Sequence, residues 1–220
     1  MNTLSGYQKQ NYDLTWFENK EWLSNHDIDH VLYYVSNKKN EFYHAGTYAQ
    51  DFQSKKDGKC LSDKCSLEML PDLSDGVKYV SFVLNTDLTS GPGIHWFCLF
   101  VDLIRKDIYV YDPASVVNNY NTIHVNALIN NICIRYNTSF CVEKNLVQKQ
   151  PSNSGECGVY VIYFILKMIE YSELYPPNPK CNVQKTKKKW KHNQKWVEKE
   201  IDNTSVFYPW YNPIERTLHQ

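Results

Sequence analysis

The chain lacks the features of several specialised classes of protein. Its 24 basic and 24 acidic residues cancel, so no excess of one charge steers the whole molecule toward nucleic acid or a membrane surface. No apolar run approaches the roughly 20 residues that a membrane-spanning helix needs. The first ten residues are polar and lack the apolar stretch of a secretory signal. We therefore expect an intracellular protein with no membrane partner.

The pattern of a disulfide framework is also lacking. Cysteines are odd in number, and in a reducing compartment we expect them to be thiols. Cys60 and Cys65 lie close together in a polar loop, but no further pair of ligands follows at a similar spacing. His26 and His30 likewise have no third ligand nearby. We predict no metal site from these residues. The seven cysteines are Cys60, Cys65, Cys98, Cys133, Cys141, Cys157 and Cys181.

No Gly/Ser-rich or Pro-rich linker divides the 220 residues. Hydrophobic residues make up 42% of the chain and charged residues 22%, a profile typical of a globular protein with a sizeable core. We predict a single domain over residues 1–220. Its core spans about residues 20–170, and residues 171–220 form a C-terminal extension of unknown role.

Hydrophobic periodicity predicts an order of helices and strands. Residues 36–75 are mixed and polar and predict mainly loop. Two of the expected strands are separated by a short polar break at residues 105–107, which indicates a hairpin. Helices are expected from residue 25, over 123–135 and from 157 to about 171, and strands over 77–84, 95–103, 107–111 and 140–147.

Cys157 is the leading candidate for a reactive group. A polar, turn-forming run ends at this cysteine, and an apolar stretch from Val159 to Met168 begins just behind it. The pattern predicts a thiol at the N-terminus of a buried helix, where unpaired N–H groups favour a negative charge and lower the pKa of the thiol. A thiolate is the nucleophile of a cysteine hydrolase.

His95 and Asp112 are candidate partners for this thiol. His95 opens one strand of the expected hairpin and Asp112 closes the other, so antiparallel pairing brings them together. A carboxylate there would hold the imidazole in one tautomer. Asp102 and Asp107 compete for this role, but they lie at the far end of the hairpin. A structural histidine and a plain buried thiol remain the alternative interpretation.

Gln150 is a candidate for the oxyanion hole, because it lies seven residues before Cys157 at the start of the turn. Its side-chain amide could donate to an oxyanion together with the backbone N–H of Cys157. Gln148 is the competing choice.

The order His95-Trp96, Asp112, Gln150, Cys157-Gly158 resembles the adenovirus protease and ubiquitin-like-protein protease superfamily of cysteine proteases. The 17-residue spacing from histidine to acid is similar to the family's. The run over 151–154 is similar to that of the adenovirus enzymes. The deSUMOylating members tend to have one residue fewer there and Asp-Cys-Gly in place of Glu-Cys-Gly.

Further motifs are similar to the polyprotein-processing (maturation) proteases of large DNA viruses, virophages and Polinton-type elements. They are Val-Leu-Asn-Thr-Asp over 83–87, Gly91, Gly93 and Phe-Val-Asp over 100–102. Trp22-Leu23-Ser24 ahead of a helix resembles the start of the catalytic domain in many members.

The resemblance implies an α+β fold of the papain-like or adenain-like kind, in which a central helix carrying Cys157 packs on a mixed β-sheet with surrounding helices. It implies a cysteine endopeptidase that cleaves at Gly-Gly or Gly-X sites and requires no cofactor. It also implies that Trp96 and Gly158 contact the substrate in a narrow channel, although core packing would explain Trp96 equally well.

The partner implied is a protein substrate, either a viral structural precursor or a conjugate of an ubiquitin-like modifier. A non-enzymatic, protease-like binding module is a third possibility. The viral motifs favour capsid or polyprotein maturation, with the protein in the host cytoplasm or nucleus, in the virion, or in both.

A basic run in the C-terminal extension is a candidate nucleic-acid contact, because two tryptophans accompany it. Glu198 and Glu200 follow, so a solvated helix face is the competing interpretation. The resemblance to the adenovirus enzyme suggests activation by DNA or a peptide. The basic residues are Lys185, Lys187, Lys188, Lys189 and Lys191.

Overall fold

A computed structural model describes residues 22–62, 65–115, 123–145, 148–152 and 154–174. Its first helix, α2 (Asn25–Lys38), begins where the sequence predicts. The Ser24 hydroxyl accepts a hydrogen bond from the Asp27 N–H, and the Asp27 carboxylate accepts one from the Ser24 N–H at 2.8 Å. This capping box satisfies two N–H groups that the first turn leaves unpaired.

A five-stranded mixed sheet forms the centre of the described fold. Its order is β1-β4-β5-β6-β7, with antiparallel pairing from β4 to β6 and a parallel strand at each edge. The strands are β1 (Phe42–Ala49), β4 (Tyr79–Asn85), β5 (Trp96–Asp102), β6 (Asp107–Tyr111) and β7 (Cys141–Lys144).

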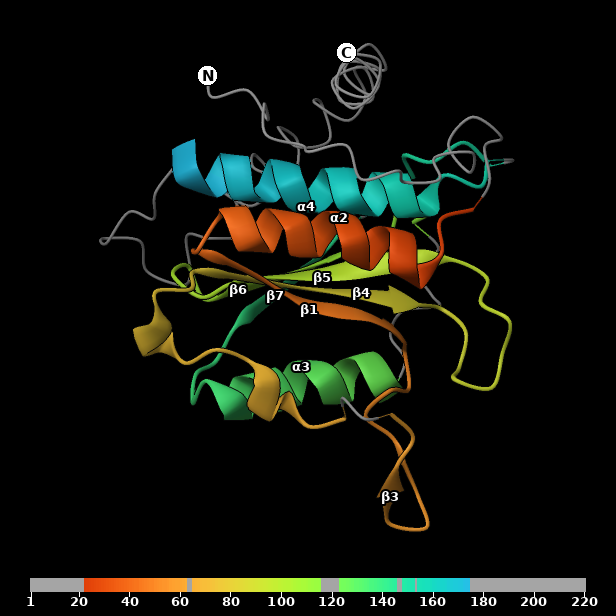
Figure 1. The fold of residues 1–220 in the computed structure, drawn as a ribbon, viewed down its shortest axis with the longest axis horizontal. Helices are drawn as coiled ribbons and strands as arrows, with labels where there is room; N and C mark the ends of the chain where they lie inside the picture. The colour runs from red at the N-terminus through yellow and green to blue at the C-terminus, as the bar shows by residue number, and fades with distance from the viewer. Residues whose placement is uncertain (1–21, 63–64, 116–122, 146–147, 153, 175–220) are drawn as a thin grey trace.

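Helices cover both faces of this sheet. Helices α4 (Cys157–Leu174) and α2 lie on one face, and α3 (Ile123–Arg135) lies on the other (Figure 1). Strand β5 is buried on both sides: Cys98 and Phe100 face the α2 and α4 layer, whereas Phe97, Leu99 and Val101 face the α3 layer. The α+β fold with the Cys157 helix packed on a mixed sheet is therefore confirmed.

The predicted helices and hairpin are also present, but one strand of the five-stranded sheet was missed. Strand β1 lies in the segment that was expected to be mainly loop. A register shift between His44 and Gly46, where Gly46 has φ +130°, interrupts the alternation of side chains. A bulge of this kind removes the period-two signal by which a strand is predicted. Helix α4 also runs three residues beyond the expected end at Tyr171.

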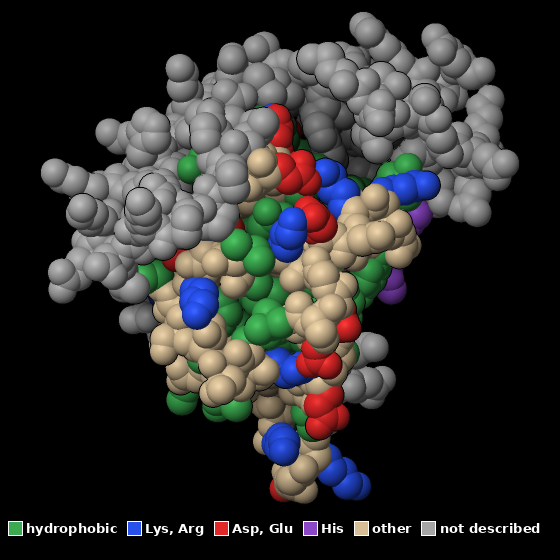
Figure 2. All heavy atoms as spheres, turned by 90° about the vertical axis from the view of Figure 1, so that its left-hand side faces the viewer, with side chains coloured by type: hydrophobic (Ala, Val, Ile, Leu, Met, Phe, Trp, Pro, Cys, Tyr) green, Lys and Arg blue, Asp and Glu red, His purple; other side chains and the backbone are tan. Residues whose placement is uncertain are grey.

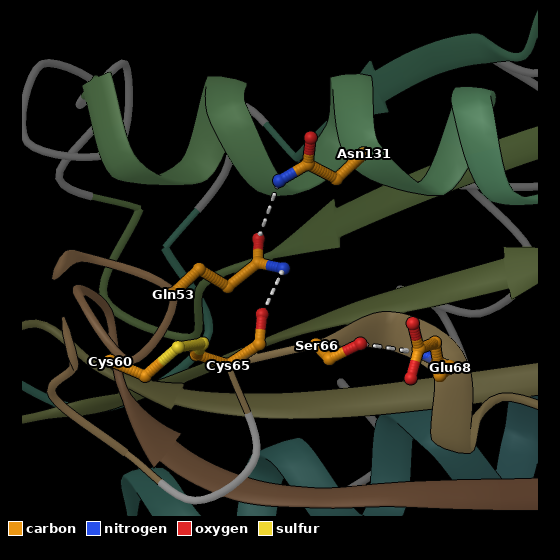
Figure 3. The surroundings of a disulfide bond; sticks show 6 residues. All are labelled: Gln53, Cys60, Cys65, Ser66, Glu68 and Asn131. Atoms are coloured by element: carbon orange, nitrogen blue, oxygen red, sulfur yellow. Dashed lines mark hydrogen bonds between the residues drawn. A yellow bond between two sulfur atoms is a disulfide. The ribbon is translucent and has the colours of Figure 1, made fainter. Parts of the chain in front are cut away.

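The expectation that Cys60 and Cys65 are thiols is wrong in this structure. Cys60, the last residue of a small hairpin of β2 (Lys55–Lys56) and β3 (Lys59–Cys60), forms a disulfide with Cys65, and their Cα atoms are 5.9 Å apart (Figure 3). The Gln53 amide connects Cys65 to α3, because it donates to the Cys65 carbonyl and accepts from Asn131, both at 3.3 Å. Two short 3-10 turns follow, η1 (Leu67–Met69) and η2 (Leu73–Asp75). Cys98, Cys133, Cys141 and Cys157 are free thiols, as expected.

The described surface shows charges of both signs side by side. In Figure 2, basic and acidic side chains are interspersed around apolar ones on one end of the molecule. No helix within the described ranges has the length and apolarity needed to cross a membrane. The lysine run and the extension beyond residue 174 lie outside the described residues.

Candidate active site

Cys157 is the first residue of the 18-residue helix α4, at the end that carries the unpaired N–H groups. The turn before it is closed by a hydrogen bond from the Ser154 N–H to the Pro151 carbonyl at 3.1 Å. Only 3% of the Cys157 surface is exposed. The sequence pattern therefore located the thiol correctly, at a buried helix start beside the sheet.

His95 and Asp112 meet at the same end of the β5–β6 hairpin. Because Cys98 pairs with Tyr111, the residues just before β5 lie beside those just after β6. The Nε2 atom of His95 is 2.5 Å from Oδ1 of Asp112. The Asp112 side chain is 2% exposed and that of His95 is 15% exposed, so water screens this pair poorly.

The surroundings of His95 change its acidity in opposing directions. Burial alone would lower the pKa of His95, but the neighbouring Asp112 and Cys157 raise it to about 9. His95 therefore interacts with both other members of the expected triad. An imidazolium is the favoured form of this ring near neutral pH.

The loop that follows Asp112 fixes the carboxylate. Oδ1 of Asp112 accepts a hydrogen bond from the Ala114 N–H at 2.9 Å as well as contacting His95. The side chain of Asn145 hydrogen-bonds to both the N–H and the carbonyl of Asp112. Asn145 was not predicted as a site residue, because it appeared only as a polar residue inside the expected strand over 140–147.

Gln150 is joined to the same loop. Its backbone N–H donates to the Pro113 carbonyl at 2.9 Å, and its buried side-chain amide donates to the Ser154 carbonyl at 2.5 Å. The competing Gln148 instead supports this turn, because its amide donates to the Gln150 carbonyl at 2.7 Å. An amide nitrogen has two hydrogens, so Gln150 retains a second one for another acceptor.

The alternative acids lie elsewhere. Asp102 is at the far end of the hairpin, where it pairs with Arg105 at 2.7 Å and accepts a hydrogen bond from Ser172. Asp107 is at that end too, and it accepts a hydrogen bond from Tyr109 at 3.1 Å. Asp112 is therefore the acid that the fold brings to His95.

A cavity of about 660 Å³ reaches Ile94 and Trp96, the residues on either side of His95, but His95, Asp112, Gln150 and Cys157 are not among the residues that line it. Trp96 and Trp22 line it together with the residues of the loop from Gly91 to Ile94. The Trp96 indole N–H donates to the Leu23 carbonyl at 2.8 Å, which fixes the orientation of the ring. Trp22 lies against the turn before Cys157, since a Cβ added at Gly155 would be 2.2 Å from its indole ring. Trp22 was not predicted as a lining residue.

Gly158 has a packing role in this structure. A Cβ added there would lie 3.0 Å from Cβ of Leu23 and 3.3 Å from Cδ1 of Ile28, so the glycine lets α4 approach the start of α2. Its contact with substrate stays a prediction. Among the described residues, no group of three or more His, Cys, Asp or Glu side chains could hold a metal ion.

Asn85 shapes the loop that leads to His95. Its side-chain oxygen accepts hydrogen bonds from the Asp87 N–H at 2.9 Å and the Ile94 N–H at 3.0 Å. The Asp87 carboxylate accepts a further one from the Gly93 N–H at 3.1 Å. These two side chains hold the segment just before His95, a role that their place in the viral motif did not reveal.

Comparison with known proteins gives consistent relatives. A protein of Acanthamoeba polyphaga mimivirus named as a thiol protease is 28% identical over 158 residues, which cover 68% of this chain and 48% of the relative. The protease of bovine adenovirus 4 is 25% identical over 99 residues, 43% of this chain and 49% of that protein. The matched part thus spans about half the length of these two relatives.

The fold is similar to that of a solved C-terminal Ulp1 protease domain in complex with Smt3, the yeast ortholog of SUMO. The TM-score is 0.52 at 15% identity, and the match covers 88% of this chain and 82% of that one. A helix-borne cysteine on such a sheet, with a histidine–aspartate pair beside it, defines the class of cysteine proteases. The chain belongs to the Ulp1 protease family, whose C-terminal catalytic domain matches residues 49–201.

Proposed function

We propose that this chain is a cysteine endopeptidase with Cys157 as the nucleophile, His95 as the general base and acid, and Asp112 as the group that orients His95. The observation that carries the proposal is that His95 interacts with both of the others: its Nε2 is 2.5 Å from Asp112, and its raised pKa includes a contribution from Cys157. If His95 were only structural and Cys157 only a buried thiol, His95 would not need to lie close to both Asp112 and Cys157.

The reaction runs in two halves. With Nε2 held by Asp112, the other ring nitrogen of His95 carries the proton of Cys157, so that an imidazolium faces a thiolate, and the thiolate attacks the scissile carbonyl carbon. His95 then gives that proton to the leaving amine as the C–N bond breaks, which leaves a thioester. In the second half His95 takes a proton from water, the hydroxide attacks the thioester carbon, and the C–S bond breaks to release the carboxylic acid, which restores the thiolate and the imidazolium.

Gln150 and the backbone N–H of Cys157 are proposed to stabilise the oxyanion. The proposal is supported by the fixed position of Gln150, whose backbone is hydrogen-bonded to Pro113 and whose amide lies in the turn before the helix. Donors that are already oriented need no rearrangement when charge develops on the substrate oxygen.

The proposed substrate is a protein with glycine at the cleavage site, Gly-Gly or Gly-X. The glycine preference is what the family resemblance implies, and the indole rings of Trp22 and Trp96 line the cavity that reaches the residues next to His95. The viral relatives support processing of a viral structural precursor, such as a capsid protein or polyprotein. Deconjugation of a SUMO-like or ubiquitin-like modifier is the second candidate, favoured by membership of the Ulp1 family.

One experiment tests both the enzyme and its substrate. The full chain is incubated with a viral structural precursor and with a Gly-Gly modifier fusion, and products are read by intact mass. We expect Cys157→Ala and His95→Ala to abolish cleavage and Asp112→Ala to leave a partial rate, because the aspartate orients but does not react. Cys141→Ala, which removes another free thiol, is the matched control and should cleave normally.

The outcomes separate the candidates. Cysteine-dependent cleavage of the precursor supports maturation, and cleavage of the fusion alone supports deconjugation. Undiminished cleavage by the Cys157→Ala protein would overturn the proposed mechanism.

A further inference from the structure

Asn145 lies directly beyond β7 and holds the backbone of Asp112 at two points. Its Nδ2 donates to the Asp112 carbonyl at 2.6 Å, and its Oδ1 accepts from the Asp112 N–H at 2.8 Å. Both residues are buried, at 8% and 2% exposed. A hydrogen bond protected from water in this way is costly to remove, because the partner left behind has no solvent to replace it.

The position of Asn145 follows from the sheet. Strands β6 and β7 are parallel neighbours in which Val110 pairs with Lys144, so Asn145 is one step past the last pair. Pro113 has no N–H and ends the ladder on the β6 side. A side-chain amide carries one carbonyl and N–H donors, as a peptide group does. Asn145 therefore extends the pairing of β6 and β7 by one further step, onto Asp112.

This contact bears on the proposed reaction through a chain of three residues. Asn145 fixes the Asp112 backbone, the Ala114 N–H fixes the Asp112 carboxylate, and the carboxylate contacts His95. We propose that Asn145 is a positioning residue, which acts through Asp112 to set the orientation and proton affinity of His95. The inference rests on the proposed function, in which His95 exchanges protons with Cys157 and substrate.

A merely structural amide would have a different signature. Loss of packing or of a buried hydrogen bond lowers the free energy of unfolding, but it leaves the acidity of His95 unchanged in the molecules that remain folded. Loss of positioning lets the carboxylate move away, and the pKa of His95 then falls from about 9 toward its ordinary value of 6.5. The titration of His95 therefore distinguishes the two roles without any need for cleavage.

The test uses the full chain with ring-labelled histidine, assigned with a His95→Gln variant and titrated by NMR. Asn145→Leu removes both hydrogen bonds and keeps the branched shape of the side chain. If the leucine variant does not fold, Asn145→Ser is used in its place. Leu128→Ala, in the buried α3 layer on the other face of the sheet, is the control for a general loss of stability. Thermal unfolding establishes that each variant is folded at the temperature used.

We expect Asn145→Leu to lower the pKa of His95 and to move the alkaline limb of kcat/KM down with it, while Leu128→Ala changes neither. The kcat should fall about tenfold with little change in KM, the scale of effect for a residue that orients a reacting group through one partner. A folded Asn145→Leu protein with wild-type titration of His95 would overturn the inference. If His95 shifts as expected but the wild type cleaves no substrate, the positioning role stands and the proposed function fails.

Discussion

At the scale of single residues, two histidines show how surroundings set the chemistry of one side chain. His95 lies just before the central strand β5, in contact with Asp112, and its pKa is raised to about 9. His44 lies inside, where burial lowers its pKa and the hydrogen bond and charge of Asp29 only partly oppose this. His95 was predicted because it opened an expected strand that paired with the strand closed by Asp112, whereas no such pattern marked His44.

His44 forms a buried relay with two partners. Its Nδ1 is 2.9 Å from the Ser81 hydroxyl, and its Nε2 is 2.9 Å from the Asp29 carboxylate. The relay joins α2, β1 and β4, so it links three elements with one ring. A neutral ring suits both partners, because Nε2–H can donate to the Asp29 carboxylate while Nδ1 accepts from the Ser81 hydroxyl.

We predict that His44 makes the protein less stable in acid. The unfolded chain takes up a proton near pH 6.5, whereas the folded state resists protonation because its pKa is lower. The stabilising contribution is therefore fully present above pH 6.5 and is lost as the pH falls through the lower pKa of the folded state. Chemical unfolding of wild type and His44→Gln between pH 5 and 8 measures it.

The control for this measurement is His26→Gln, at an exposed position in α2. It should retain the wild-type dependence on pH, and His44→Gln should flatten it. An equally steep curve in the His44→Gln protein would mean that other groups carry the acid sensitivity.

At the scale of elements, the helices and strands that were predicted correctly are those whose signals lie in their own residues. Helix α2 has its capping box, α4 has its turn and apolar face, and β5 and β6 have a short polar break between them, so each could be recognised from its own residues. Strand β1 could not, because its bulge at His44 and Gly46 removes the alternation. Its parallel pairing with β4 joins segments about 37 residues apart, for which no short-range signal exists.

The same limit applies to the site. His95, Asp112 and Cys157 were predicted because their roles follow from residue type and from strand or helix ends. Asn145 and Trp22 act across elements that only the folded sheet brings together, so their spacing in the chain carries no comparable signal. The residues that were missed, Asn145 and Trp22, surround the expected triad and do not belong to it.

The turn before α4 provides an element-scale prediction. A Cβ at Gly155 would occupy the place of the Trp22 indole, so Gly155→Ala should displace that ring or the turn that precedes Cys157. We expect kcat/KM to fall by up to about 100-fold, the cost of a misplacement of roughly 1 Å near reacting groups. The measurement is a double-mutant cycle with Trp22→Ala. The two changes should be strongly non-additive, and simple additivity would contradict the contact.

The Cys60–Cys65 disulfide provides a second prediction at the scale of elements. Leu61 and Ser62, which follow Cys60, line the cavity beside Trp96, and the disulfide ties their segment back to Cys65. We expect a Cys60→Ser/Cys65→Ser variant to raise KM and leave kcat nearly unchanged, because it loosens one wall of the cavity but not the triad. Non-reducing peptide mass mapping of the wild type should show the linked pair, and Cys133→Ser is the matched control.

An unchanged KM in the double serine variant would show that the hairpin does not border bound substrate. Both variants are purified under anaerobic conditions without added reductant, because oxidation of Cys157 would mimic a loss of activity and a reductant would cleave the Cys60–Cys65 disulfide.

At the scale of the whole molecule, the balance of charge limits how the protein meets its partners. The net charge is zero, and exposed ion pairs such as Lys39–Glu173 and Lys78–Glu41 place opposite charges next to each other. Long-range steering toward a polyanion is therefore weak for the chain as a whole. Any strong attraction to nucleic acid has to come from the lysine run over 185–191, which lies outside the described residues.

We predict that DNA raises the cleavage rate, and that it does so through the lysine run alone. Phosphate contacts release counterions, so the activation should fall steeply between 50 and 200 mM salt, as it does for any binding that depends on several phosphates (about 10³-fold or more for six contacts). Replacement of five lysines by alanine should abolish the activation while basal cleavage persists. These are Lys185, Lys187, Lys188, Lys189 and Lys191. The matched control replaces five exposed lysines of the folded part, Lys38, Lys39, Lys55, Lys56 and Lys59, and should keep the activation. Cleavage that ignores both DNA and salt would instead assign the basic run to a solvated helix face, and the site around Cys157 would then work without a polyanion.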